Sequence, residues 1–291
     1  MQLIPWSYAT DAGFTLRGHY TPPSGKPVLH FLHGNGFCSR IYEPMLEHLT
    51  DIFDLFLSDA QGHGDSDHGG AFIGWNKSAE LAGKAWTEHK NIFGSVPVFG
   101  AGHSFGGILT SLLHASPSSP FKATVLLDPI LFTPTMLLAM STLSTVRVYH
   151  KNPMAKAALR RRQHWPDRAA ALTYLTGRGM FKGWHPAALN AYIEHAMQPD
   201  EHGLTLKCRP QREAEVFSSY PEKLWYHLSQ PSNPVHVIYG EQSYPFIEKS
   251  LLKWQKKNSA ISITKTAGGH CFMQEYPDIA ANKIRQVFHL L

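Results

Sequence analysis

The sequence predicts an α/β fold with a mostly parallel central sheet, helices on both faces of that sheet, and an inserted helical segment. Short apolar runs alternate with helix-like segments as far as residue 130, a pattern typical of a parallel sheet whose faces are both covered. The alternation then stops, and it resumes towards the C-terminus. A chain of 291 residues with 43% hydrophobic residues can form one large domain with an insertion.

The expected strands are apolar runs dominated by valine, isoleucine, leucine and phenylalanine, and most of them end at Gly, Asp, Ser or His. Because ligands of parallel sheets bind at the carboxyl ends of strands, we expect chemistry directly after these runs. The runs are 27–33 (PVLHFLH), 54–58 (DLFLS), 96–102 (VPVFGAG), 123–128 (ATVLLD), 234–240 (PVHVIYG) and 261–267 (ISITKTA).

Helix-like segments separate these runs and then dominate the middle of the chain. Those between the early strands are 41–49 (IYEPMLEHL), 78–90 (SAELAGKAWTEHK) and 105–116 (FGGILTSLLHAS). Those in the middle are 135–143, 153–165, 168–175 and 186–197, with no run of strand character among them. We predict an α/β core at 1–130 and 232–291 and a helical cap at 131–231, with a separate helical domain as the alternative.

Composition and charge favour a cytoplasmic protein that acts on a small molecule, as a monomer or homodimer. The formal net charge of +5 is too small for this length to indicate nucleic-acid or membrane binding. The three cysteines are widely spaced and lack metal-site spacing, which favours reduced thiols. The N-terminus has no basic start followed by an apolar stretch, and no run approaches the ~18 apolar residues of a membrane span.

Ser104 is the candidate nucleophile. It lies in the motif GHSFG (102–106), directly after an expected strand and directly before an expected helix. A nucleophile in such a turn has a strained backbone and needs small neighbours, and the helix N-terminus offers N–H groups to a developing oxyanion. A small-residue loop is the alternative for the motif alone, but its position between strand and helix favours the nucleophile.

Two further segments complete the predicted site. The motif HGNG (33–36) ends an early strand, and we expect the N–H groups of Asn35 and Phe105 to form the oxyanion hole, with His33 as a buried histidine that shapes the loop. Asp59, in the turn SDAQGHGDSD (58–67), is interpreted as a loop-fixing residue. His270 follows the last expected strand in TAGGHCFMQEYP (266–277), where it can reach the nucleophile as general base.

These motifs resemble those of α/β-hydrolases with a helical cap, a group that includes esterases, carbon–carbon bond hydrolases, epoxide hydrolases and haloalkane dehalogenases. The resemblance covers 1–130 and 232–291 and depends on HGNG (33–36), DAQGHGDS (59–66), GHSFG (102–106) and GGH (268–270). It implies a nucleophile, an acid and a histidine in that order.

The acid departs from the family pattern. In most members it follows the strand after the cap, which here places Ser243 at the expected position, and serine cannot serve as an anionic partner. Asp128, after the strand before the cap, resembles the acid of many haloalkane dehalogenases. We predict Asp128 as the triad acid; Glu241, or no functional acid, are the alternatives.

A serine nucleophile points to ester or thioester cleavage through an acyl-enzyme rather than to the carboxylate chemistry of epoxide hydrolases and dehalogenases. A carbon–carbon bond hydrolase, an acyltransferase and a non-catalytic ligand-binding scaffold are the alternatives. Nothing in the sequence indicates a metal or an organic cofactor. We expect an apolar or aromatic substrate of small to medium size, contacted by Phe37, Trp165, Trp184 and Phe272.

Overall fold

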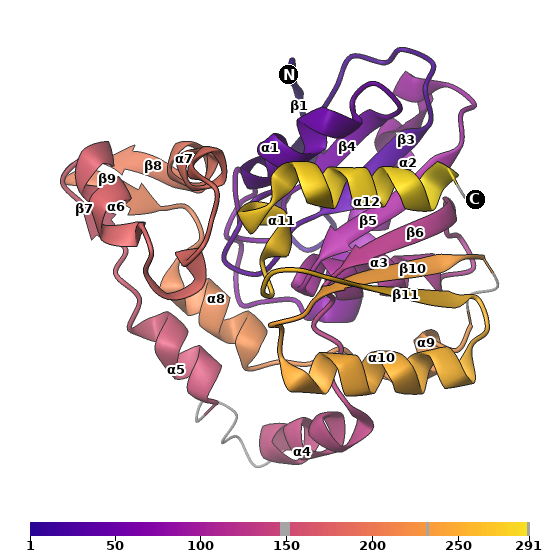
Figure 1. Cartoon of the computed structure of the whole chain (residues 1–291). Coiled ribbons are helices and arrows are strands. Elements are labelled where there is room, and N and C mark those ends of the chain that lie inside the picture. Colours follow the sequence, from indigo (N-terminus) through magenta and orange to yellow (C-terminus); the bar gives the residue numbers. More distant parts are fainter. Residues whose placement is uncertain (146–151, 231–232, 290–291) are drawn as a thin grey trace.

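A computed structural model describes residues 1–145, 152–230 and 233–289, and it confirms the predicted fold class (Figure 1). One sheet of eight strands has the order β1-β2-β4-β3-β5-β6-β10-β11. Neighbours from β4 to β11 are parallel, whereas β1–β2 and β2–β4 are antiparallel. The strands are β1 (Ile4–Ala9), β2 (Thr15–Tyr20), β3 (Val28–Leu32), β4 (Asp54–Ser58), β5 (Val98–His103), β6 (Phe121–Leu127), β10 (Val235–Gly240) and β11 (Ile261–Thr266).

The six predicted strands are confirmed, whereas β1 and β2 were not predicted. Both lie at one edge of the sheet, and β1 buries only Trp6 among residues that are otherwise exposed or half-buried. An edge hairpin of this kind lacks the continuous apolarity by which the buried parallel strands were recognised.

Helices cover both faces of the sheet (Figure 1). On one face α1 (Glu43–Leu46) and α12 (Pro277–His289) pack together, and on the other face α2 (Trp75–His89), α3 (Phe105–His114) and α10 (Pro245–Lys257) lie against the strands. Alternate strand residues enter separate clusters: Leu55 and Leu57 belong to the core beneath α12, and Phe56 to another cluster. The predicted helix at 41–49 is a single α turn between two 3₁₀ turns.

The long segment between β6 and β10, called the insertion here, leaves and re-enters the sheet at neighbouring strands. Its helices are α4 (Pro134–Thr145), α5 (Pro153–Leu159), α6 (Arg168–Leu175), α7 (Pro186–His195), α8 (Pro210–Phe217) and α9 (Leu224–His227). Figure 1 shows α4 to α8 as an arc beside the core, whereas α9 contacts α3 of the core. The positions 146–151 and 231 of the predicted cap lie outside the described residues.

The insertion also contains three short strands that were not predicted from the sequence. A second sheet of three antiparallel strands has the order β7-β9-β8, with β7 (His164–Trp165), β8 (Met197–Asp200) and β9 (Gly203–Leu206). The predicted helices at 153–165 and 186–197 end at Leu159 and His195, and their last residues enter these strands. Pairing overrides local helical preference in both places: Trp165 pairs with the distant Leu204, and Met197 pairs with Leu206 across a short hairpin. In the described ranges no helix combines the length and apolarity needed to cross a membrane.

Candidate active site

Ser104 lies in a strained turn between β5 and α3. Its φ of 53° and ψ of −113° are rarely adopted by residues with a side chain, and its N–H donates to the carbonyl of Leu127 at 3.1 Å. The turn also needs close packing, because a Cβ on Gly106 would lie 2.2 Å from the carbonyl oxygen of Leu32. The Ser104 side chain faces a cavity, at the N-terminus of a buried helix.

His270 is brought to Ser104 by the loop between β11 and α11 (Phe272–Glu275). Its Nε2 lies 2.9 Å from Ser104 Oγ, which is hydrogen-bond distance. The Tyr244 ring meets the imidazole edge-on at a centroid distance of 5.0 Å. Within the same loop, the Gly269 N–H donates to both carboxylate oxygens of Glu275 at 3.1 and 3.2 Å. The loop therefore places an imidazole nitrogen within hydrogen-bond reach of the Ser104 hydroxyl, which is the geometry that a general base needs.

Asp128 lies on the other side of His270. It follows β6, is fully buried, and places Oδ2 at 3.7 Å from His270 Nδ1. The Ser243 hydroxyl donates to Asp128 Oδ1 at 2.8 Å, and the Gly240 N–H donates to Oδ2 at 3.3 Å. Glu241 is exposed on the neighbouring turn, and no ion pair joins it to His270 in the described part of the chain. The structure thus brings Asp128, and not Glu241, to the histidine.

Asn35 and Phe105, whose N–H groups are expected to form the oxyanion hole, both line the same cavity as Ser104. The Gly34 carbonyl, in the same peptide plane as the Asn35 N–H, accepts hydrogen bonds from His33 Nδ1 at 2.8 Å and from the Phe37 N–H at 3.2 Å. Because a trans peptide points its C=O and N–H in opposite directions, these bonds orient the Asn35 N–H. Across the described residues, no protein acceptor is bonded to the N–H of Asn35 or Phe105.

The Asn35 side chain is held by hydrogen bonds within the protein. Its amide donates to the backbone carbonyl of Glu213 in α8 at 3.0 Å, and its Oδ1 lies 3.1 Å from His63 Nε2. The Glu213 carboxylate pairs with Arg161 at 2.7 Å, and both side chains are largely buried. The insertion and the loop around Asn35 are therefore joined by a hydrogen bond next to a buried ion pair.

His33 and Asp59, which were interpreted from the sequence as loop-shaping residues, are both buried and hydrogen-bonded to neighbouring loops. His33 is 1% exposed, its Nε2 accepts the Ala60 N–H at 3.0 Å, and burial lowers its pKa, so it is neutral. Asp59 accepts hydrogen bonds from the N–H groups of Ser39 at 2.7 Å and Asp65 at 3.1 Å, which closes its loop. Neither side chain lines the cavity.

The cavity above Ser104 has a volume of about 940 Å³, at the upper end of the range for small-molecule sites. Its lining is mainly apolar, and the insertion contributes a group of methionines. The apolar side chains from the segment between β6 and β10 are Ile130, Phe132, Met136, Ala139, Met140, Pro153, Met154, Met180, Val216 and Phe217.

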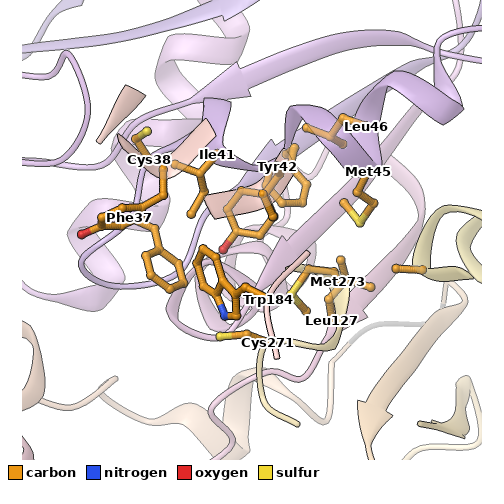
Figure 2. Packing of buried hydrophobic residues seen from close by; sticks show 14 of the residues in the cluster. Phe37, Cys38, Ile41, Tyr42, Met45, Leu46, Leu127, Trp184, Cys271 and Met273 are labelled. Carbon is orange, nitrogen blue, oxygen red and sulfur yellow. The ribbon is translucent and has the colours of Figure 1, made fainter. Parts of the chain in front are cut away.

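Of the four side chains expected to contact substrate, the structure brings only Phe37 to the cavity. Trp184 lies between the core and the insertion, where its ring meets Phe37 edge-on, and Figure 2 shows it among Phe37, Tyr42 and Cys271. Trp165 is 2% exposed and Phe272 is 1% exposed, and both belong to the same hydrophobic core. These three aromatic rings are buried in the core and do not line the cavity, because core burial removes most of their large apolar surface from water.

Comparisons with known proteins agree with this fold. A sequence model described as the alpha/beta hydrolase family matches residues 31–282. The chain is 32% identical over 114 residues to the abhydrolase domain-containing protein AKT2 of Alternaria alternata, covering 39% of this chain and 38% of that protein. It is 26% identical over 199 residues to the type I acyl-CoA thioesterase mpaH of Penicillium roqueforti, covering 60% and 42%. Each alignment thus spans less than half of the relative's length.

A solved structure with low sequence identity has the same fold. The crystal structure of E-2-(acetamidomethylene)succinate hydrolase aligns with a TM-score of 0.76 at 23% identity, and the alignment covers 98% of each chain. The family match covers most of the sequence, from β3 into α12, and includes the segments of Ser104, Asp128 and His270. The chain belongs to the alpha/beta hydrolase family, a family of enzymes.

Proposed function

We propose that the protein is a serine hydrolase that cleaves carboxylic esters or thioesters of small to medium apolar substrates through an acyl-enzyme on Ser104. The observation that supports this best is the 2.9 Å contact between Ser104 Oγ and His270 Nε2, made from a strained turn that faces a large apolar cavity. Strained backbone at a serine within reach of a base is characteristic of an activated nucleophile.

The proposed reaction has two halves. Ser104 Oγ attacks the substrate carbonyl carbon and gives its proton to His270 Nε2, while the N–H groups of Asn35 and Phe105 stabilise the oxyanion. His270 then protonates the leaving alcohol or thiol, and the acyl-enzyme remains. Water, deprotonated by His270, releases the carboxylic acid and restores the serine. Asp128 stabilises the imidazolium in both halves from the Nδ1 side.

The Asp128 contact of 3.7 Å is longer than a hydrogen bond, and His270 Nδ1 has no hydrogen-bond acceptor among the described residues. Catalytic hydrogen bonds of this kind commonly shorten when a substrate is bound. A charged Asp128 held by the Ser243 hydroxyl and the Gly240 N–H is well placed for this role.

Thioester cleavage is supported by the similarity to a protein named as an acyl-CoA thioesterase. The preference for apolar substrates is supported by the cavity lining, because flexible methionine side chains adapt to apolar groups of varied shape. We therefore expect kcat/KM for p-nitrophenyl esters and for acyl thioesters to rise with acyl length, up to about fourfold per buried methylene.

Labelling by a fluorophosphonate tests the nucleophile directly. The probe should modify Ser104 stoichiometrically, as read by intact mass and peptide mapping, and Ser104→Ala and His270→Ala should abolish labelling. Ser118→Ala, at an exposed turn, is the matched control and should label as the parent chain does. A parent chain that is folded but not labelled would contradict the serine hydrolase and favour a ligand-binding scaffold.

Substrate panels separate the remaining alternatives on the same fold. Turnover of p-nitrophenyl esters or acyl thioesters with release of the free acid supports the proposal. Transfer of the acyl group to an added alcohol in preference to water would support an acyltransferase. Cleavage of a vinylogous diketone without ester turnover would support a carbon–carbon bond hydrolase.

A further inference from the structure

His103, the residue before Ser104, connects two loops of the site through side-chain hydrogen bonds. Its Nδ1 lies 2.7 Å from the Tyr42 hydroxyl, and its Nε2 lies 2.9 Å from the backbone carbonyl of His270. The Tyr42 hydroxyl in turn accepts the Gly34 N–H at 3.1 Å. A continuous path of three hydrogen bonds therefore runs from the loop of Asn35 to the loop of His270.

Only one arrangement of protons satisfies this path. The His270 carbonyl can only accept, so His103 Nε2 must hold the proton, and a neutral ring then leaves Nδ1 as an acceptor. Tyr42 must therefore donate to Nδ1 while its oxygen accepts from Gly34. Burial lowers the pKa of His103 well below its ordinary value, with His270 nearby as the next cause, so the neutral form is the stable one.

Packing holds the His103 ring in place. It is fully buried, stacks on Phe37 at a centroid distance of 6.1 Å, and lies against the His270 ring at 4.9 Å. A Cβ on Gly34 would lie 2.8 Å from His103 Nδ1, so the close approach of this loop to the ring requires glycine. Figure 2 shows the Tyr42 side chain pointing towards Trp184 and Phe37.

We propose that His103 and Tyr42 are positioning residues that set the spacing between the oxyanion donor on Asn35 and the general base His270. The proposal rests on the proposed function. The oxyanion donor Asn35 and the base His270 lie on loops that follow different strands, β3 and β11, and three other strands stand between these two in the sheet. A hydrogen-bonded bridge between them restricts independent motion of the two loops.

The expected size of the effect follows from the geometry that catalysis needs. Displacement of a reacting or stabilising group by about 1 Å reduces rate on the order of 100-fold, and loss of one oxyanion donor costs about as much. We expect ground-state binding in the apolar cavity to depend little on this spacing, because most of the lining residues lie outside the bridge. The bridge should therefore affect kcat and leave KM for an apolar ester almost unchanged.

The experiment compares His103→Phe, Tyr42→Phe and the double variant. Phenylalanine keeps a flat ring at either position and removes the hydrogen bonds. We expect each single variant to lower kcat about 10- to 100-fold with KM within about threefold of the parent. If the two residues act as one bridge, the double variant should be no slower than His103→Phe alone. Multiplied effects in the double variant would overturn the single bridge.

Two further variants of His103 each keep one of its two hydrogen bonds, so they test the two bonds separately. His103→Gln can place an amide N–H near the Nε2 position and keep the bond to His270, whereas His103→Asn can place an amide oxygen near Nδ1 and keep the bond from Tyr42. Each should recover part of the kcat lost in His103→Phe. Equal loss in both variants and in His103→Phe would assign the residue to packing alone.

Transition-state affinity separates positioning from general damage. A trifluoromethyl ketone adds to Ser104 Oγ, transfers the serine proton to His270 and forms an oxyanion at the two N–H donors. Its Ki should rise across the variants in proportion to the fall in kcat/KM, while Ki for the product carboxylic acid stays constant. Variants that lose ketone and acid affinity alike would contradict the proposal.

His30→Phe is the matched control for burial. His30 is fully buried on β3, and its Nε2 bonds the Ser58 hydroxyl at 3.0 Å, away from the cavity. Urea unfolding should show a loss of stability in His30→Phe as well as in His103→Phe, but only the latter should change kcat and ketone Ki. An inactive, unlabelled parent chain would remove the proposed function itself, whereas an active parent with fully active variants would remove only the bridge.

Discussion

At the scale of single residues, the site combines backbone strain with charge. Among the described residues, positive φ outside glycine occurs at Ser104 (53°), Asp128 (42°) and Lys223 (49°). Two of these three flank His270, and each is held by a backbone hydrogen bond to the adjacent strand, from Ser104 N to Leu127 and from Asp128 N to Ile238. Such strain persists only where the surrounding structure enforces it, and it concentrates at functional sites.

Replacement of the acid tests the charge at this scale. Asp128→Asn should lower kcat for esters on the order of 10⁴-fold, because the imidazolium loses its anionic partner and the tautomer of His270 is no longer controlled. Glu241→Gln, at the exposed neighbouring position, is the control and should have a mild effect. Steady-state kinetics on one p-nitrophenyl ester decides the matter, and the reverse order of effects would remove Asp128 from the site.

Relief of strain is a second residue-scale prediction. Ser104→Gly should abolish labelling by a fluorophosphonate and yet raise the free energy of unfolding by about 1 kcal/mol, since glycine accepts positive φ without steric cost. Ser104→Ala keeps the Cβ and should not show this gain. Urea denaturation of the two variants gives the comparison, and equal stability of both would show that the turn stores no such strain.

At the scale of elements, the order of parallel strands assembles the site. The carboxyl ends of β5, β6, β10 and β11 are consecutive along the sheet and lead directly to Ser104, Asp128, Ser243 and His270. The position at which the family usually has its acid is therefore next to Asp128, and its serine hydroxyl donates to the Asp128 carboxylate at 2.8 Å. Adjacent strands thus offer two positions for one negative charge beside the histidine.

This adjacency predicts that the charge can be moved. Adding Ser243→Asp to Asp128→Asn should recover about 10- to 100-fold of the lost kcat, because the new carboxylate enters the same buried site from the neighbouring strand. Gln242→Asp in the same background places a charge one residue away and should recover little. A double variant no faster than Asp128→Asn would show that position 243 cannot reach His270 Nδ1.

The contact between α8 and the loop of Asn35 gives an element-scale prediction for stability. Glu213→Gln should cost about 3 kcal/mol of unfolding free energy, because it leaves the largely buried Arg161 without its charge partner. Adding Arg161→Met should restore part of the loss, since no buried charge then remains unpaired. Urea unfolding of the single and double variants tests this, and additive losses would contradict the pairing.

At the scale of the whole molecule, the core contains an unusual number of buried histidines. His30, His33, His63 and His103 are at most 1% exposed. Burial lowers the pKa of each one, that of His30 from 6.5 to about 3. The folded protein therefore keeps these rings neutral in a pH range where the unfolded chain protonates them. His30 and His103 lie on β3 and β5, His33 directly follows β3, and His63 lies in the loop after β4.

The sign of the pH effect follows from these lowered pKa values. Below the unfolded pKa the unfolded chain binds more protons than the folded protein, so stability is lost as pH falls from about 6.5 towards 3. Between about pH 7.5 and 5.5 each such histidine should remove about 1 kcal/mol of unfolding free energy. His30→Gln should reduce the pH dependence of the unfolding free energy by the contribution of one histidine, whereas His202→Gln, at an exposed turn, should not. A curve flat between these two pH values would contradict neutral burial.

Much of the architecture could be predicted because its signals are local. Continuous apolar runs identified the six buried strands, and the GHSFG and GGH motifs located Ser104 and His270 from their immediate neighbours. Edge strands β1 and β2 and the small sheet of the insertion could not be predicted, because half-exposed or very short strands lack such runs. The roles of Trp165, Trp184 and Phe272 were equally inaccessible, since apolarity alone does not distinguish a core position from a cavity wall.

Apolar runs and short motifs were enough to predict the fold class and the candidate residues Ser104 and His270. The folded structure identifies the carboxylate beside His270, because strand order, rather than distance along the chain, brings Asp128 and Ser243 together. It also decided that Phe37 and the methionines face the cavity, and that His103 and Tyr42 join two loops distant in sequence. Side-chain contacts of this kind depend on how strands and helices pack, and packing is a property of the assembled core rather than of any local segment.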